Sequence, residues 1–180
     1  GGSIRACSPG AGLGATFTVS LPLLDVHAPP DNFAALPDSH LASFHISPAF
    51  LHEIKDIKVL IVDDEPDSRA IIARLLKWCG ASVTPASSAR EALHLRQAAR
   101  PDVLISDIGM PVEDGYFLIR RVRALPPRQG GLIPAIALTA YTRPEDRTNI
   151  LNAGFQSHVP KPVQPAELIA SIARLTPRSR

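Results

Sequence analysis

From residue 57 onward, short apolar runs alternate with segments whose apolar residues recur at helical spacing. The first run, KVLIVD at 58–63, is almost entirely apolar, which is typical of a strand buried on both faces of a sheet. The next segment, 67–79, has apolar residues one helical turn apart and is followed by Gly80, a common residue just past a helix end. This spacing predicts a strand and then a helix.

The same alternation continues along the rest of the chain. Ser88 and Glu91 have the spacing of a capping box, as do Thr142 and Glu145, and Pro165 suits the first turn of a last helix. The predicted strands are 58–63, 81–86, 103–107, 133–140 and 155–162, and the predicted helices are 67–79, 88–99, 116–125, 142–154 and 165–175.

Five strands that alternate with five helices predict an α/β fold with a parallel sheet covered by helices on both faces. Right-handed crossovers make such a sheet doubly wound. In this class of fold, ligands bind beyond the carboxyl ends of the strands. Polar residues at those ends are therefore the candidates for a functional site.

The first 56 residues have a different pattern. Residues 1–23 are rich in glycine and end in an alternating run at 15–23 that predicts a strand. Residues 24–56 contain prolines and histidines without a sustained period, which is typical of a linker, with a short helix expected near 48–54. The linker histidines are too irregularly spaced for a metal site; they are His27, His40, His45 and His52.

Composition adds a few exclusions. The net charge is only +2 and the arginines are scattered, so we expect no nucleic-acid partner. Cys7 and Cys79 give no disulfide framework, which fits a reducing, cytoplasmic location, and we expect Cys79 to be a buried helix residue. The uncharged stretch 6–24 is interrupted by glycines and prolines, so we expect no membrane-spanning segment.

Reactive side chains stand at the ends of four predicted strands: Asp63 and Asp64, Asp107, Thr139 and Lys161. Carboxylates at contact distance repel one another, so such a cluster takes up protons or binds a cation, and hard oxygen ligands suit Mg²⁺. A carboxylate beside Mg²⁺ can attack phosphorus, while an ammonium and a hydroxyl group compensate the incoming charge. Each residue alone could be an ordinary turn, cap or surface residue. Their joint placement at one edge of one sheet favours a site.

Four segments in this order, VLIVDDEP, LISDIGMPVEDG, ALTA and VPKP, make residues 57–176 resemble a receiver domain of bacterial two-component signalling. The resemblance implies the flavodoxin-like receiver fold with strand order 2-1-3-4-5. It also implies that Asp107 accepts a phosphoryl group from a phosphohistidine on a kinase or phosphotransfer domain, and that water later removes it. The implied metal ligands are Asp63, Asp64, Asp107 and the backbone carbonyl of Gly109, and the implied contacts to the phosphoryl oxygens are Thr139 and Lys161.

One position departs from the family pattern. Three residues before Lys161, where the family commonly has Tyr or Phe, this chain has His158. In the family that ring turns inward with the threonine on phosphorylation. Our hypothesis is that His158 couples weakly to Thr139 in a pH-sensitive way. The alternative is a partly exposed strand histidine with no such role.

Residues 1–23 resemble the last segment of a histidine kinase ATP-binding domain, including a glycine box at 10–14. The asparagine-bearing helix and the earlier nucleotide-binding boxes of that domain are absent. We therefore expect no ATP binding by this chain and no native fold in this segment. A kinase tail, a linker at 24–56, a receiver at 57–176 and a short tail at 177–180 predict a fragment of a hybrid sensor histidine kinase without a DNA-binding output domain.

The sequence argues against two other function classes. A hydrolase with an aspartyl nucleophile would need a second acid two residues after Asp107, where the chain has Gly109. A receiver-shaped interaction module that is never phosphorylated should have lost an acidic or lysine position, and none is lost. We expect the conformational output on the face made by the fourth helix, the fifth strand and the fifth helix of the receiver.

Overall fold

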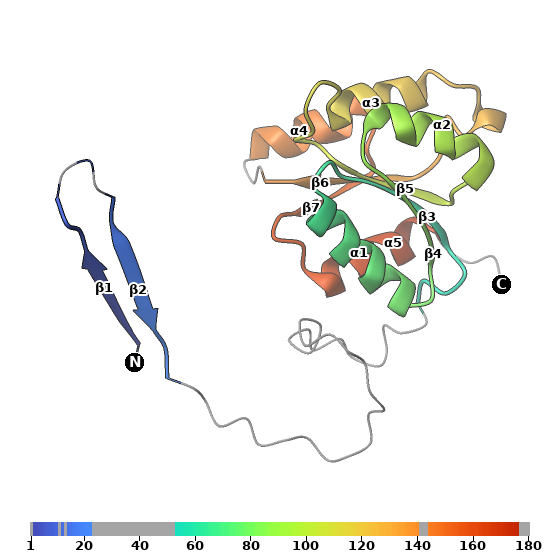
Figure 1. Ribbon diagram of the computed structural model, residues 1–180. Coiled ribbons are helices and arrows are strands. Elements are labelled where there is room, and N and C mark those ends of the chain that lie inside the picture. Colours follow the sequence, from blue (N-terminus) through green and yellow to red (C-terminus); the bar gives the residue numbers. More distant parts are fainter. Residues whose placement is uncertain (1, 11, 13, 23–52, 141–143, 177–180) are drawn as a thin grey trace, which may run out of the picture. The chain divides into compact units, whose positions relative to one another are not determined.

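The computed structural model describes residues 2–10, 12, 14–22, 53–140 and 144–176 (Figure 1). The chain divides into two compact units, Gly1–His40 and Leu41–Arg180, and each is described by itself.

Within the described part of the second unit, five parallel strands alternate with five α-helices. The strands are β3 (Lys58–Val62), β4 (Ser82–Ala86), β5 (Val103–Asp107), β6 (Ala135–Thr139) and β7 (Ser157–Pro160). The helices are α1 (Pro66–Trp78), α2 (Ala89–Ala99), α3 (Gly115–Arg123), α4 (Pro144–Ala153) and α5 (Pro165–Leu175), and the short 3₁₀ helix η2 (Pro127–Gln129) follows α3. The order across the sheet is β4-β3-β5-β6-β7, which confirms the predicted fold and strand order.

The helices cover both faces of the sheet, as Figure 1 shows. On one face, α1 and α5 pack against alternate strand residues, with Leu76 and Ile169 fully buried. On the other face, α2, α3 and α4 pack against the intervening strand residues, with Ile119 and Ile150 fully buried. The central strands are therefore apolar on both sides, as the run at 58–63 predicted.

Local signals explain most helix ends. Ser88 accepts a hydrogen bond from the backbone N–H of Glu91 at 3.2 Å, as the predicted capping box requires. The Glu91 carboxylate, however, does not return to Ser88; it accepts from the backbone N–H and the hydroxyl of Ser87, at 2.6 Å each. Asp114 caps α3 by accepting from the N–H of Phe117 at 2.6 Å. Thr142, of the second predicted capping box, lies outside the described residues.

The predicted strands 133–140 and 155–162 are longer than β6 and β7, because the ladder pairing covers only 135–139 and 157–160. Cys79 is fully buried at the end of α1, as expected, and burial raises the pKa of its thiol. None of the described helices has the length and the apolar character that crossing a lipid bilayer requires.

The described part of the first unit is an antiparallel hairpin of β1 (Ser3–Cys7) and β2 (Thr16–Ser20). The predicted strand at 15–23 contains β2, whereas β1 was not predicted. The register pairs Ile4 with Val19 and Ala6 with Phe17, so these four side chains share one face. Residues 48–52 of the predicted linker helix lie outside the described residues, and 53–56 form a turn.

Candidate functional site

Two adjacent strands bring the first acidic side chains together. Asp63 directly follows β3 and Asp107 ends β5, and the register of these strands pairs Val62 with Ser106. The next positions along both strands are the two aspartates, which therefore lie side by side at the carboxyl edge of the sheet. Both are buried, with Asp63 fully enclosed, whereas Asp64 is exposed.

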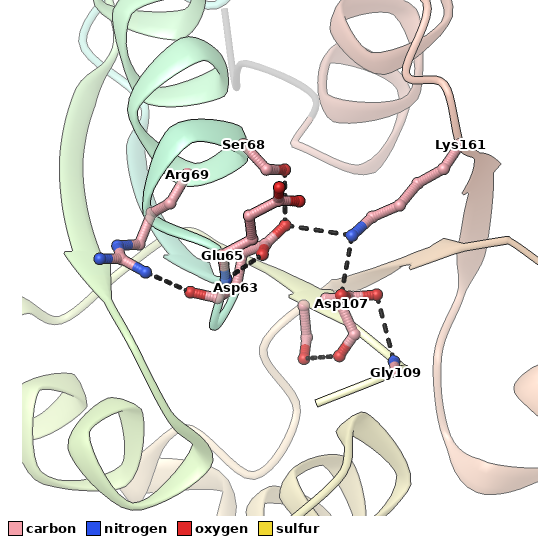
Figure 2. A network of polar contacts seen from close by, with 8 residues as sticks. Asp63, Glu65, Ser68, Arg69, Asp107, Gly109 and Lys161 are labelled. Atoms are coloured by element: carbon pink, nitrogen blue, oxygen red, sulfur yellow. Dashed lines mark hydrogen bonds and ion pairs between the residues drawn. The ribbon is translucent and has the colours of Figure 1, made fainter. Parts of the chain in front are cut away.

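Lys161 connects the two buried carboxylates (Figure 2). It follows β7 and extends its ammonium between them, with Nζ at 2.7 Å from Oδ2 of Asp107 and 3.2 Å from Oδ2 of Asp63. Burial lowers the pKa of Lys161, but the hydrogen bond and charge of Asp107, together with those of Asp63, outweigh it and raise the pKa above its ordinary value. Lys161 therefore stays protonated at neutral pH and shares its charge between the two aspartates.

The start of α1 orients the Asp63 carboxylate. Its Oδ1 accepts from the backbone N–H of Glu65 at 2.9 Å, and its Oδ2 accepts from the hydroxyl of Ser68 at 2.8 Å in addition to Lys161. Arg69 donates from Nη1 to the backbone carbonyl of Asp63 at 2.5 Å. These contacts hold the side chain and backbone of Asp63 in one orientation (Figure 2).

Sequence reasoning missed Ser68 and Arg69. The sequence indicates them only in part. Pro66 marks the first position of α1, so the first turns of this helix lie directly beyond the end of β3. Which side chains of that turn face the carboxylate depends on how α1 packs on the sheet.

The loop after β5 packs closely around Asp107. The backbone N–H of Gly109 donates to Oδ1 of Asp107 at 3.2 Å, which fixes the oxygen that Lys161 does not bind. Gly115 lets the loop return closely, because a Cβ atom there would lie 2.4 Å from the carbonyl oxygen of Asp107. The predicted ligation through the Gly109 carbonyl stays a prediction.

Asp63, Asp64 and Asp107 form a group that could hold a metal ion. One carboxylate oxygen from each lies within 4.8 Å of the others. At an effective dielectric constant of about 20, two carboxylates at this distance repel by about 3.5 kcal/mol. Lys161 supplies one positive charge against three negative ones, so a divalent cation is the natural complement. Carboxylate oxygens in this number, partly open to solvent, fit Mg²⁺, which keeps several of its waters.

The structure also brings Thr139 to this edge. It ends β6 and is buried, and its backbone carbonyl accepts from the N–H of Lys161 at 2.7 Å. The register pairs Ala137 with His158 and Thr139 with Pro160, so His158 and Thr139 share one face of the sheet on neighbouring strands. His158 is half-buried at the edge strand β7. The roles predicted for these side chains stay predictions.

Comparison with known proteins places these residues in a family. The family model for the response regulator receiver domain matches residues 59–173. An uncharacterized 14.6 kDa protein from the sodA1 3′ region of Leptolyngbya boryana is 47% identical over 119 residues, 66% of this chain and 89% of that protein. The probable transcriptional regulator ycf27 of Guillardia theta is 40% identical over 68% of this chain, which spans only 46% of that regulator.

Solved structures give the same result. The chemotaxis protein CheY4 of Vibrio cholerae matches with 35% identity and a TM-score of 0.62, over 67% of this chain and 98% of that one. The receiver domain of a sensor histidine kinase from Pseudomonas aeruginosa, with a magnesium ion coordinated in its active site cleft, matches with 32% identity and a TM-score of 0.62, over 68% of this chain and 99% of that one. Because the family match covers the residues that build both the sheet and its acidic edge, this chain belongs to the response regulator receiver domain family.

Proposed function

We propose that this receiver accepts a phosphoryl group on Asp107 from a phosphohistidine. The observation that carries the proposal is the ammonium of Lys161, which bridges Asp107 and Asp63 at 2.7 and 3.2 Å inside an acidic cluster at the carboxyl edge of the sheet. A lysine that only balanced surface charge would not be held between two buried carboxylates. This placement gives Asp107 a cationic partner and puts an ammonium where phosphoryl oxygens would arrive.

The chemistry follows from the side chains present. A carboxylate oxygen of Asp107 attacks phosphorus, an O–P bond forms, and the N–P bond of the phosphohistidine breaks with its electron pair staying on the imidazole nitrogen. Lys161 moves its hydrogen bonds from the carboxylate to the phosphoryl oxygens, and the hydroxyl of Thr139 donates to another of them. Mg²⁺ bound by Asp63, Asp64, Asp107 and the carbonyl of Gly109 would supply the remaining positive charge.

The partner follows from the reaction. A receiver domain works with a histidine kinase or a histidine phosphotransfer domain, and the proposed donor is the phosphohistidine that such a protein carries. The alternative is a receiver-shaped interaction module that is never phosphorylated, and the two are separated by one experiment.

Intact mass after incubation with Mg²⁺ and a small acyl phosphate tests the proposal. The parent chain should gain the mass of one phosphoryl group, and Asp107→Ala should gain none. Asp146→Ala is the matched control, because Asp146 lies in the first turn of α4 and is not part of the acidic cluster. This variant should gain the same mass as the parent. No added mass in the parent would favour the interaction module, and labelling of Asp107→Ala would place the acceptor elsewhere.

We also propose that the chain derives from a hybrid sensor histidine kinase. The support is the resemblance of residues 1–23 to the end of a kinase ATP-binding domain and the hairpin they contain. Ile4, Phe17 and Val19 on its apolar face are 73%, 69% and 60% exposed, and a two-stranded hairpin is at best marginally stable alone. Such a face is expected of a hairpin that completes a larger sheet. The reading frame upstream of the Gly1 codon should encode nucleotide-binding boxes, and unrelated sequence or a stop codon there would contradict this origin.

A further inference from the structure

A second group of polar side chains lies at the amino ends of the strands, opposite to the acidic cluster. The last turn of α2 leads into β5, and η2 leads into β6, so both elements lie at the amino ends of the strands, away from Asp107. Between them is an open pocket of about 540 Å³. Figure 1 shows the end of α2 beside the segment that joins α3 to β6.

Three arginines line this pocket: Arg96 in the last turn of α2, Arg100 at its C-cap and Arg128 in η2. No acidic side chain lines it, and among the described residues none of the three forms an ion pair. The nearest acid along the chain, Asp102, is already used, because its Oδ2 accepts from the backbone N–H of Lys58 at 2.8 Å. The pocket therefore carries three positive charges that the described fold leaves uncompensated.

Arg96 is the residue that makes this more than a cationic surface. It is only 8% exposed, and burying a guanidinium is costly unless its donors are bonded. Its Nη1 donates to the backbone carbonyl of Gln129, yet its Nε is buried without a hydrogen-bond partner among the described residues. Gly130 leaves the guanidinium this space, since a Cβ atom there would lie 3.3 Å from Nη1.

A purely structural role accounts for only part of this arrangement. Basic residues in a last helical turn complement the helix dipole, but an exposed side chain does that equally well, as Arg100 can. The bond to Gln129 anchors the loop before β6, but it uses one nitrogen of the guanidinium and leaves Nε without a function. Neither role requires Arg128 to face the same space.

We propose that this pocket binds a small molecule that carries a phosphate group. Guanidinium groups bind phosphate oxygens through paired N–H donors, and three of them line this pocket. Pro101, Pro127 and Ile133 supply an apolar wall for the organic part of the ligand. The volume is within the usual range of small-molecule sites. The inference does not rest on phosphorylation of Asp107, because the pocket lies at the other edge of the sheet.

Titration of the full chain with inorganic phosphate, without Mg²⁺ and followed by ¹H–¹⁵N correlation spectra, tests the proposal. Saturable shifts are expected for the backbone amides of Gln129 and Gly130 and for Nε–H of Arg96. Adenosine monophosphate should bind more tightly than inorganic phosphate if the apolar wall is used, and citrate distinguishes a site for phosphate from one for any anion. Shifts confined to residues around Asp107 and Lys161, or no saturation up to about 10 mM, would overturn the proposal.

Matched variants with equal net charge separate a site from general attraction. Arg100→Gln/Arg128→Gln removes two exposed arginines of the pocket and should weaken phosphate binding at least about tenfold, with at most the small loss of stability that follows from removing a charge at a helix C-terminus. Arg90→Gln/Arg121→Gln removes two exposed arginines of α2 and α3 outside the pocket and should leave the affinity unchanged within about twofold. Equal loss in both double variants, or tighter binding of citrate than of phosphate, would contradict a phosphate site.

Discussion

Among the described residues, one position with an unfavourable backbone conformation lies in the loop between Asp107 and α3. Val112 has a φ of 68° and is fully exposed, so a β-branched side chain occupies the left-handed region without any packing to hold it there. Such a conformation costs a non-glycine residue about 1–2 kcal/mol. Glycine avoids this cost but loses about 0.5–1 kcal/mol of stability, because it gives the unfolded chain more conformational entropy.

Val112→Gly should therefore raise the free energy of unfolding by about 0.5–1 kcal/mol in urea titrations. Leu132→Gly is the control, because Leu132 is also exposed but has an ordinary negative φ. That variant should lose stability. A loss of the same size in both variants would show that the loop conformation at Val112 carries no strain.

His158 is the residue whose predicted role departs from the family pattern. Its imidazole lies in a groove of about 450 Å³ with Arg147 of α4 and Glu167 and Arg174 of α5, on the face where we expect the output. A charged imidazole is more costly to bury than a neutral one, so a proton on the ring would disfavour its inward movement. His158→Tyr removes this charge and keeps a ring.

In a series of pH values, the phosphorylated parent should change its ¹H–¹⁵N spectrum and its partner affinity, while the phosphorylated tyrosine variant should not. The unphosphorylated forms serve as the control for spectral changes that do not depend on phosphorylation. Identical spectra and affinities of parent and variant across the pH series would reject the coupling of His158 to Thr139.

At the scale of elements, the start of α2 carries a pH dependence. The Ser87 side chain and then its backbone N–H hydrogen-bond to the Glu91 carboxylate and lower its pKa, with a smaller contribution from the charge of Arg69. A carboxylate whose pKa is lowered on folding contributes stability above its unfolded pKa, and the contribution is lost as the pH falls through the lowered value.

Glu91→Gln should be less stable than the parent at neutral pH and equally stable in acid, as measured by urea unfolding at a series of pH values. Because Glu91 is exposed, solvent screening makes the difference small, and Ser88→Ala, which removes the cap itself, should cost more, about 1 kcal/mol. A Glu91→Gln deficit that persisted at low pH would assign the effect to side-chain shape rather than charge.

The elements themselves could be predicted from the chain wherever one period dominated. Buried runs such as 58–63 and amphipathic segments such as α1 carry enough apolar positions to distinguish strand from helix. The strand β1 was missed because five residues with an arginine and two small side chains form no such run; its pairing with β2 defines it. The helices α2 and α3 each start at one capping side chain, Ser88 and Asp114 respectively. The sequence pattern indicates the Ser88 cap but not the Asp114 cap.

At the scale of the whole molecule, the site was predictable because topology places it. Parallel strands bring their carboxyl ends to one edge, so Asp63, Asp107, Thr139 and Lys161 could be grouped before any coordinates. The sequence does not show which of two adjacent aspartates is enclosed, because that depends on how α1 packs. The pocket of Arg96 was not predictable either, since it forms between the end of one helix and a loop more than thirty residues away.

The acidic cluster also links metal binding to the stability of the whole second unit. Asp63 and Asp107 are held together in the folded state against their repulsion, with Lys161 as the only cation bonded to both among the described residues. A divalent cation that binds the three carboxylates in the folded state alone stabilises it by RT ln(1 + [L]/Kd), about 2.7 kcal/mol at a hundredfold excess over Kd. Mg²⁺ should therefore raise Tm, with a logarithmic dependence on its concentration.

Trp78, the single tryptophan of the chain, lies at the end of α1 and reports unfolding of this unit by fluorescence. Asp64→Asn is the informative variant: Asp64 is exposed and is not part of the Lys161 bridge, so the variant should fold like the parent and lose most of the Mg²⁺-dependent rise in Tm. Sodium chloride at matched ionic strength controls for screening and should give little of the rise. An equal rise for Asp64→Asn and the parent would mean that Mg²⁺ stabilises the protein away from the carboxyl edge, and that the three carboxylates do not act as one site.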